Sequence, residues 1–277
     1  MTISVIIPVF NCEKYIEKCL ESVLSQKGAD LDVIVINDGS FDKTDEILTK
    51  YEKEVRIKKT PNRGISAARN EGIRMIRGEY TMFLDSDDYL KAGTIETLSS
   101  VIEETDADIV KFRYKLVYPN GKEKLPGNQF DKYDLIEKKD FKEKVYPYFI
   151  NGIRLNSMCV GIYRSDLIKG REFREDMPVA EDAVFSIGTY TLAGRLAVIP
   201  DILYYYYQTG KGLTGSGTNI KQKYRCNFIF AKETSRLLKE WDMNTFFMKI
   251  RVWLRPLLLT FDKIMRVLQS KKTGSGD

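Results

Sequence analysis

Histidine is absent from the 277 residues of this chain. This absence excludes a histidine base, a histidine metal ligand and a serine–histidine catalytic triad within the chain. Acid–base chemistry near neutral pH would therefore have to use carboxylates, or less readily tyrosine, lysine or cysteine side chains.

Cysteine is scarce as well. Cys12, Cys19, Cys159 and Cys226 show neither metal-ligand spacing nor a dense disulfide framework. Cys12 and Cys19 are expected two turns apart on one helix, which is too far for a disulfide along it. We therefore expect reduced thiols and a cytoplasmic setting. Because Met1 leads directly into a predicted strand, no signal peptide is expected.

Neither sign of charge is in large excess. The net charge is +5, and charged residues of both signs are interspersed along the chain. This pattern argues against a dedicated nucleic-acid surface, so no nucleic-acid partner is expected. A hydrophobic content of 43% is typical of a globular protein. The length allows one large core, or one domain with a smaller appendage.

The first ninety residues alternate between strand and helix patterns. Apolar runs of strand length occur at residues 3–9, 32–36, 55–58 and 80–84, and amphipathic helical patterns at residues 15–26, 42–51 and 66–75. Continuous apolar strands alternating with helices indicate parallel strands covered on both faces, which is an α/β sheet. Ligands of such sheets bind beyond the carboxyl ends of the strands.

The rest of the chain is less regular. We expect strands at residues 109–117 and 196–207, the latter as one or two strands around Pro200. Residues 141–149 are predicted to be helical, and a further helix is expected to begin at Ser165. After Thr218 the pattern is helical to the end, in two or three segments.

The acidic turn Asp85–Asp88 directly follows one of the predicted buried strands. Three carboxylates in four residues are costly to bring together unless a cation or hydrogen-bond donors neutralise them. Oxygen ligands on a short turn suit Mg²⁺ or Mn²⁺, which in turn could hold a diphosphate. A solvated turn that caps the next helix is the alternative, and the turn alone leaves both open.

A second polar motif, Asn37–Ser40, ends another predicted strand. The Asp38 carboxylate could accept a hydrogen bond from a nucleobase, and Gly39 permits close approach of the backbone to a ligand. Taken alone, the motif is more typical of an Asx turn that leads into a helix, with Ser40 or Asp42 as the cap.

A third motif, Pro61–Asn70, brings two arginines and two asparagines to a predicted helix start. Guanidinium groups beside a helix N-terminus suit a phosphate or a nucleotide. A capped and salt-bridged helix start explains the same residues equally well.

Together these motifs closely resemble the family 2 glycosyltransferases in order, spacing and strand–helix context. The resemblance rests on residues 5–11, 37–40, 64–70 and 83–88, and on the Glu-Asp element within residues 180–185, so it reaches to about residue 205. One departure is Asn37, which stands where the family often has a second aspartate.

The resemblance implies the GT-A fold, an α/β fold with a mixed, mostly parallel sheet flanked by helices. The catalytic domain would cover residues 1–217, with a nucleotide-binding half at about 1–90 and an acceptor half at about 91–217. Residues 218–277 would form a helical C-terminal extension. The implied activity is an inverting transfer from a nucleotide-sugar, most often UDP-linked, assisted by Mn²⁺ or Mg²⁺. The acceptor would be a saccharide or a lipid-linked saccharide, in surface or capsular polysaccharide synthesis.

Carried over by position, the resemblance assigns seven residues to the nucleotide-sugar: Pro8, Phe10, Asp38, Asn62, Arg69, Asp85 and Ser86. Pro8 and Phe10 would border the nucleobase, and Asp38 would bond to it. Asp87 would be the direct metal ligand, with Asp85 near the ribose and the metal. Asp88 has a less defined role and could be a helix cap.

Glu181 and Asp182 are the expected catalytic pair. Inverting transfer needs a base that removes the acceptor proton, and the leaving diphosphate needs a cation. Asp182 is the expected base because it matches the family's position and no histidine competes. Glu181 could orient the acceptor or perturb the ionisation of Asp182. Without the upstream motifs, an ordinary helix start would explain both acids.

Two later segments have open interpretations. Alternation along a strand would place two of the tyrosines Tyr204–Tyr207 in the core and the other two on one face of the sheet, where their rings could stack on a sugar. The favoured interpretation is that these tyrosines pack in the core and at the sheet edge. The glycine-rich residues 211–217 could be a lid over the donor, with Lys211 facing the diphosphate, or an idle surface loop.

Residues 245–272 form the clearest amphipathic helical pattern. Its apolar face comprises Phe247, Ile250, Leu254, Leu257, Leu258, Phe261, Ile264, Met265 and Leu268; its basic side comprises Lys249, Arg251, Arg255, Lys263 and Arg266. Pro256 is a candidate kink. The uninterrupted apolar stretch is far shorter than the ~20 residues that span a bilayer. The helix could lie on the inner face of the cell membrane, near a lipid-linked acceptor, or pack on the catalytic domain or a dimer partner.

Two other functions compete with sugar transfer. A nucleotidyltransferase also uses paired aspartates on an α/β sheet, but it would need a glycine-rich basic signature that residues 8–18 lack. A nucleotide- or carbohydrate-binding module without catalysis is the second alternative, and the presence of Asp87 and Asp182 argues against it.

Overall fold

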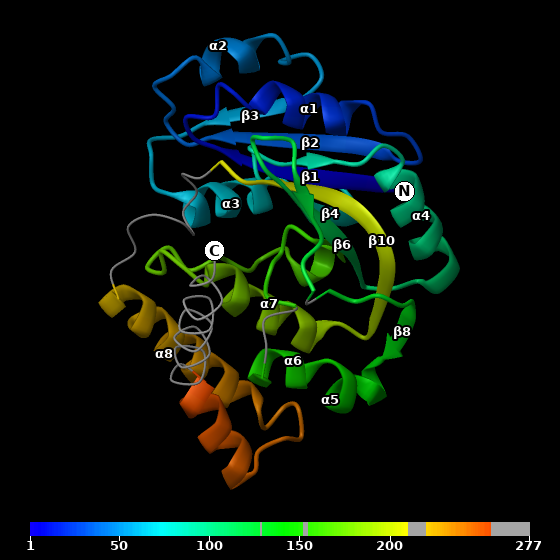
Figure 1. Cartoon of the computed structure of the whole chain (residues 1–277), viewed down its shortest axis with the longest axis vertical. Coiled ribbons are helices and arrows are strands. Elements are labelled where there is room, and N and C mark those ends of the chain that lie inside the picture. Colours follow the sequence, from blue (N-terminus) through cyan, green and yellow to red (C-terminus); the bar gives the residue numbers. More distant parts are fainter. Residues whose placement is uncertain (128, 152–154, 210–219, 256–277) are drawn as a thin grey trace, which may run out of the picture.

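The computed structural model describes residues 1–127, 129–151, 155–209 and 220–255. These residues build one mixed sheet flanked by helices, with a group of helices beyond its lower edge (Figure 1). The strands follow the order β3-β2-β1-β4-β9-β6-β10-β5, with β7 beside β6 and β8 beside β10. This arrangement confirms the predicted α/β class.

The first ninety residues contain the predicted alternation of strands and helices. Its parallel strands are β1 (Thr2–Val9), β2 (Asp30–Asn37), β3 (Arg56–Lys59) and β4 (Tyr80–Phe83). The helices between them are α1 (Ile16–Leu24), α2 (Thr44–Thr49) and α3 (Ile65–Arg74). Every β1 residue after Thr2 is buried, so the sheet is covered on both faces. Parallel pairing brings the carboxyl ends of β1, β2 and β4 to one edge.

Antiparallel pairs dominate the second half of the sheet. β9 (Gly161–Arg164) runs antiparallel to both β4 and β6 (Ile109–Val117), and β10 (Arg195–Tyr207) runs parallel to β6. The short strands are β5 (Tyr89–Leu90), β7 (Glu123–Lys124) and β8 (Asp134–Glu137), each antiparallel to its neighbour.

Of the predicted later elements, the segment around Pro200 takes the one-strand arrangement, whereas the helix at Ser165 differs from the prediction. β10 is one strand that passes through Pro200, and its register with β6 shifts between Val198 and Ile202, because proline cannot donate a ladder hydrogen bond. The helix predicted to begin at Ser165 is only a 3₁₀ turn, η2 (Ser165–Leu167).

The remaining helices cover the sheet ends and build the helical group. They are α4 (Thr94–Thr105), η1 (Lys138–Asp140), α5 (Phe141–Lys144), α6 (Tyr146–Asn151), α7 (Glu181–Leu192) and α8 (Ile220–Leu237). The single helix predicted at residues 141–149 is thus divided into α5 and α6. Residues 246–255 are also helical.

The C-terminal extension packs on α6 and α7 as far as it is described. α8 lies against α7 (Figure 1), and the Trp241 ring stacks on Tyr146 with centroids 4.3 Å apart. The indole N–H of Trp241 donates to Thr191 at the end of α7, at 2.8 Å. None of the helices within the described ranges is long and apolar enough to cross a membrane.

All four cysteines are buried free thiols. Cys19 lies on α1 as predicted, whereas Cys12 precedes the helix, and its carbonyl accepts hydrogen bonds from Tyr15 and Ile16. The predicted placement of both cysteines on one helix is therefore wrong.

Candidate active site

The segments that follow β1 and β2 are tied together at the carboxyl edge of the sheet. Asn11 has a left-handed backbone with φ 49°, and its side-chain oxygen accepts the Phe41 N–H at 3.0 Å. The Asn11 N–H in turn donates to the Ser40 hydroxyl at 3.0 Å. These bonds hold Phe10 beside Phe41, with the ring centroids 5.8 Å apart and edge to face.

Both rings are open to solvent, as expected for a site that borders a nucleobase. Phe10 is 44% exposed and Phe41 83% exposed, whereas Pro8 is buried within β1. The sequence prediction included Phe10 and missed Phe41. The available signal was a large aromatic residue directly after the Asn37–Ser40 motif, where a turn would ordinarily carry a small polar residue.

Asp38 is buried and fixes the loop that precedes α3. Its carboxylate accepts the N–H groups of Arg63 at 3.0 Å and Gly64 at 2.8 Å, and the Thr60 hydroxyl at 3.3 Å. Asp38 Oδ1 accepts two of these hydrogen bonds and Oδ2 accepts one, so Oδ2 can accept another; contact with a nucleobase stays a prediction. Asn62 lies exposed on the same loop.

Gly39 is required by this loop rather than by open space for a ligand. It has φ +75°, and a Cβ at this position would lie 2.8 Å from the backbone nitrogen of Asn62. Asn37 forms the Asx turn that was the alternative reading, because its side-chain oxygen accepts the Ser40 N–H at 3.0 Å. Asp42 accepts the N–H of Thr44, the first residue of α2, at 2.9 Å, but the N-cap residue of this helix is Lys43, which forms no side-chain cap hydrogen bond.

The acidic turn after β4 is attached to β10 through Asp88. This side chain is buried and accepts the Tyr207 N–H at 2.8 Å and the Tyr204 hydroxyl. Because α4 begins only at Thr94, the alternative prediction of Asp88 as a helix cap is wrong. Burial raises the pKa of Asp88 well above its ordinary value, with Asp85 and Asp87 adding to the effect.

Asp87 is the carboxylate of this turn with the least compensated charge. Burial, together with the negative charge of Asp85, raises the pKa of Asp87 to about 6. Within the described part of the chain, no lysine or arginine forms an ion pair with Asp87. Ser86, between the two acids, hydrogen-bonds to the Cys12 thiol.

Asp85 and Asp87 offer an all-oxygen set of protein ligands, which suits Mg²⁺ or Mn²⁺. The described residues contain no cluster of three or more histidine, cysteine or acidic side chains that would hold a metal by themselves. Oxygens of a diphosphate and of water would complete the coordination, which is the usual arrangement for Mg²⁺ at phosphate sites.

Arg69 joins the two groups of acids that the sequence analysis treated separately. It lies on α3, is 2% exposed, and its Nη2 donates to Asp85 Oδ1 at 2.9 Å. Its Nη1 contacts Glu181 Oε1 at 3.0 Å and Asp182 Oδ1 at 2.6 Å. Burial acts to lower the pKa of Arg69, but the surrounding negative charges outweigh it and raise that pKa well above its ordinary value. Contact of Arg69 with a nucleotide stays a prediction.

Asp182 lies in the first turn of α7, directly across Arg69 from the acidic turn. Its Oδ2 accepts the Met158 N–H at 3.4 Å. Burial, reinforced by Glu181 and Asp85 and opposed by Arg69, raises the pKa of Asp182 to about 7. A carboxyl group with this pKa can take up a proton near neutral pH.

The four consecutive tyrosines of β10 are engaged in packing. Tyr204 bonds to Asp88 in the core, and Tyr205 stacks on Tyr89 with centroids 4.8 Å apart. Tyr206 and Tyr207 lie against Tyr114 and Tyr15, respectively. These contacts support the favoured packing interpretation. The proposed lid at residues 211–217 lies outside the described residues.

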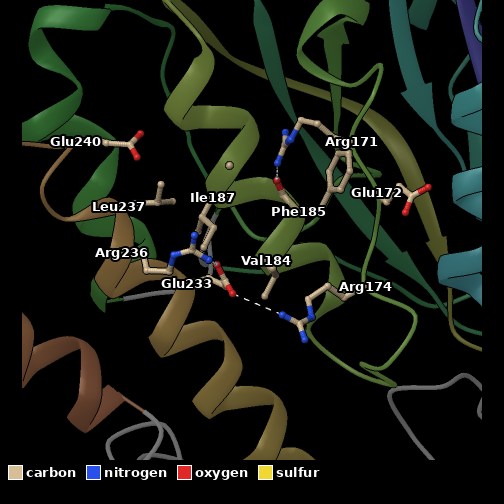
Figure 2. A pocket seen from close by; sticks show the side chains of 11 residues that line it. Arg171, Glu172, Arg174, Val184, Phe185, Ile187, Glu233, Arg236, Leu237 and Glu240 are labelled. Atoms are coloured by element: carbon tan, nitrogen blue, oxygen red, sulfur yellow. Dashed lines mark hydrogen bonds and ion pairs between the residues drawn. The ribbon is translucent and has the colours of Figure 1, made fainter.

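A cavity of about 370 Å³ lies elsewhere, between α7, α8 and the segment before α7 (Figure 2). Figure 2 shows Arg174 facing Glu233, at 3.5 Å, and Arg171 bonded to the Phe185 carbonyl. The lining mixes arginines and glutamates in equal number and includes none of the predicted site residues. We therefore locate the candidate active site at the carboxyl edge of the sheet and not in this cavity.

Comparison with known proteins identifies the family of this chain. The family described as "Glycosyl transferase family 2" matches residues 4–169, which is more than half of the chain. The chain is 30% identical to the uncharacterized glycosyltransferase EpsJ of Bacillus subtilis, over 76% of this chain and 62% of EpsJ. It is also 30% identical to the poly(ribitol-phosphate) beta-N-acetylglucosaminyltransferase TarS of Staphylococcus aureus, over 76% of this chain and 36% of TarS.

A solved structure supports the same relationship. The crystal structure of S. aureus TarS 1–349 in complex with UDP-GlcNAc superimposes with a TM-score of 0.72, at 28% identity, over 84% of this chain and 66% of that one. The chain belongs to glycosyl transferase family 2. It spans less than two thirds of the length of the relatives EpsJ and TarS.

Proposed function

We propose that this protein transfers a sugar from a UDP-sugar to a saccharide or lipid-linked saccharide acceptor, with inversion at the anomeric carbon, in the synthesis of a surface polysaccharide. The observation that carries the proposal is the position of Asp182 opposite the acidic turn, with Arg69 between them. The relatives support it, because TarS is named as a beta-N-acetylglucosaminyltransferase and its crystal structure holds UDP-GlcNAc.

The described edge of the sheet would hold the nucleobase and the diphosphate of the donor. Phe10 and Phe41 are exposed aromatic walls for the uracil ring, and Asp38 supplies a carboxylate beside them. Asp85 and Asp87 would hold a divalent cation, which when bound would supply positive charge to the departing diphosphate.

Asp182 would act as the base. Its carboxylate would accept the proton of the acceptor hydroxyl while that oxygen attacks the anomeric carbon from the face opposite the diphosphate. Arg69 would keep Asp182 and Glu181 in place, and Glu181 would orient the acceptor. The raised pKa of Asp182 makes its carboxylate a stronger base than an exposed aspartate.

The proposed donor and metal sites can be tested by thermal unfolding. A ligand that binds only the folded state raises the melting temperature. UDP should therefore stabilise the protein in the presence of Mn²⁺ or Mg²⁺ and much less in EDTA. Asp87→Asn should lose this metal-dependent stabilisation, whereas Asp166→Asn, a change at an exposed aspartate, should retain it. Equal stabilisation by UDP with and without metal would contradict the metal assignment.

We further propose that the C-terminal helix contacts an anionic membrane surface on the cytoplasmic side. Among its described residues, Phe247 is 80% exposed and Trp253 43% exposed, and Lys249 and Arg251 are exposed beside them. Arg255, expected on the solvent side, is instead buried against the Phe230 ring at 4.0 Å. Exposed aromatic and basic side chains are typical of helices that lie at a lipid interface. Residues 256–272 lie outside the described residues.

Liposome flotation tests this contact. The protein should float with vesicles that contain phosphatidylserine and remain at the bottom with phosphatidylcholine alone, since the attraction depends on anionic lipid. Replacing Phe246 and Phe247 by serine should abolish flotation. Phe41→Ser removes an equally exposed aromatic ring far along the chain and should leave it intact. If the double variant instead converts a dimer into a monomer in sedimentation experiments, the apolar face is a dimer contact and the membrane proposal is wrong.

A further inference from the structure

Lys111 is a buried lysine that none of the recognised motifs includes. It lies on β6, is 2% exposed, and its ammonium group donates a hydrogen bond to the Ser157 carbonyl at 2.8 Å. Burial lowers the pKa of Lys111 to about 7, with Cys159 and Asp182 acting in the opposite direction. An ammonium group in the interior is costly, so its retention calls for a specific interaction.

The neighbouring strand is shaped to admit this side chain. Lys111 pairs with Gly161 of β9, and a Cβ at Gly161 would lie 2.9 Å from Lys111 Cδ and 2.8 Å from the Tyr163 hydroxyl. Any larger residue at this position would displace Lys111 or Tyr163. The two side chains therefore occupy one compartment that glycine leaves open.

Both side chains converge on the segment that precedes β9. The Ser157 carbonyl accepts from Lys111 Nζ and, at 3.4 Å, from the Tyr163 hydroxyl. The same peptide group carries the Met158 N–H, which donates to Asp182 Oδ2 at 3.4 Å. Lys111 thus holds one side of a peptide whose other side contacts the Asp182 carboxylate.

We propose that Lys111 is a positioning residue for Asp182: it fixes the Ser157–Met158 peptide so that its N–H faces the carboxylate, and its positive charge favours the ionised form of that carboxylate. The inference rests on the proposed function, in which Asp182 is the base. The groups that face Asp182 from the surrounding elements are Arg69, Glu181, Asp85, Cys159, Tyr163 and Lys111. Of these, Lys111 supplies buried positive charge from the β6 side, and Arg69 supplies it from α3.

The test measures the ionisation of Asp182 directly, in the protein without substrate. Aspartate carboxyl groups labelled with ¹³C are titrated by NMR, and Asp182→Asn identifies the Asp182 signal. Lys111→Met removes both the charge and the donor, so the titration midpoint of Asp182 should rise by about 0.5 to 1 pH unit. Lys115→Met, on the same strand but in an ion pair with Glu123 at 2.7 Å, should leave the midpoint unchanged. An unchanged midpoint in Lys111→Met would overturn the proposal.

A second readout separates positioning from a merely structural role. Replacing a buried charge by an apolar side chain of similar volume is often neutral or stabilising, so the melting temperature of Lys111→Met should be equal to or above that of the wild type. A marked fall in melting temperature with an unchanged Asp182 midpoint would show that Lys111 supports only the fold.

The reciprocal measurement does not require Lys111 to be replaced. Because Asp182 favours the charged form of Lys111, Asp182→Asn should lower the titration midpoint of the Lys111 side chain, followed by ¹³C-lysine NMR. No change would contradict the coupling. Since no donor or acceptor is present, a failure to find sugar transfer would test the proposed function alone and leave these results intact.

Discussion

Asp182→Asn should abolish sugar transfer while leaving the binding of UDP unchanged. Removing a general base typically costs a factor of about 10²–10⁴ in turnover. Asparagine preserves the size of the side chain and can still face Arg69, but it cannot accept the acceptor proton. The measurement is nucleotide release from a panel of UDP-sugars with candidate acceptors, together with the UDP-induced shift in melting temperature. Asp166→Asn, at an exposed aspartate, is the matched control and should retain full turnover.

The pH dependence of the same reaction gives an independent check. The base must be deprotonated to act, and the pKa of Asp182 is raised to about 7. Turnover should therefore rise with pH through about 7 and fall below it as Asp182 becomes protonated. Normal turnover in Asp182→Asn, or a rate that is flat between pH 6 and 8, would contradict the assignment of Asp182 as the base.

Arg69→Met should be among the most destabilising single substitutions in this chain. It would leave Asp85, Glu181 and Asp182 without their shared cation, and breaking a buried ion pair by removing one partner costs about 3–5 kcal/mol. Urea denaturation would show the loss as a lower midpoint. Arg74→Met removes an exposed arginine from the same helix, paired with Glu71 and Glu172, and should change stability by less than about 1 kcal/mol.

The pH dependence of the stability of Arg69→Met distinguishes unneutralised charge from lost packing as the cause of its lower stability. Without Arg69, the pKa of Asp182 should rise further, because the favourable positive charge is gone. Protonation at low pH then removes part of the repulsion, so the difference in stability from the wild type should narrow as the pH falls from 8 to about 6. A difference that does not vary with pH would point to lost packing instead of unneutralised charge.

Local patterns in the sequence were sufficient for the framework of the site. The alternating apolar strands and amphipathic helices of the first ninety residues predicted the parallel strands, and parallel pairing places their carboxyl ends at one edge. The sequence pattern therefore suffices to place the residues after β1, β2 and β4 at the same edge of the sheet. Their chemical roles rested on the family resemblance.

Contacts between distant segments could not be predicted in this way. Arg69 was expected beside the nucleotide, but it binds Asp182, 113 positions away, and the helical pattern around Arg69 contains no information about that partner. The sequence leaves the role of Asp88 undefined, with a local cap as one possibility because short polar side chains at turns usually bond locally, whereas its donors are on β10. Lys111 looked like one polar position in an ordinary strand. In each case the decisive neighbour comes from another part of the chain.

The orientation of the helix at residues 246–255 likewise depends on contacts with a distant segment of the chain. The sequence correctly predicted a helix at these positions, but an amphipathic pattern alone does not tell which side of the helix another element will cover. Val252 and Arg255 are buried, while Phe247 and Ile250 remain exposed. The orientation follows from the aromatic surface of α8, which receives Arg255 on Phe230.

Helix α7 contains the candidate base and also contacts the C-terminal extension. Asp182 stands in its first turn, and Thr191 in its last turn is held by Trp241 from the C-terminal extension. The extension therefore helps to hold the helix that carries the candidate base. Catalysis would consequently depend on residues that do not contact the sugar. A chain shortened after residue 217 is therefore expected to have lower activity than the full chain.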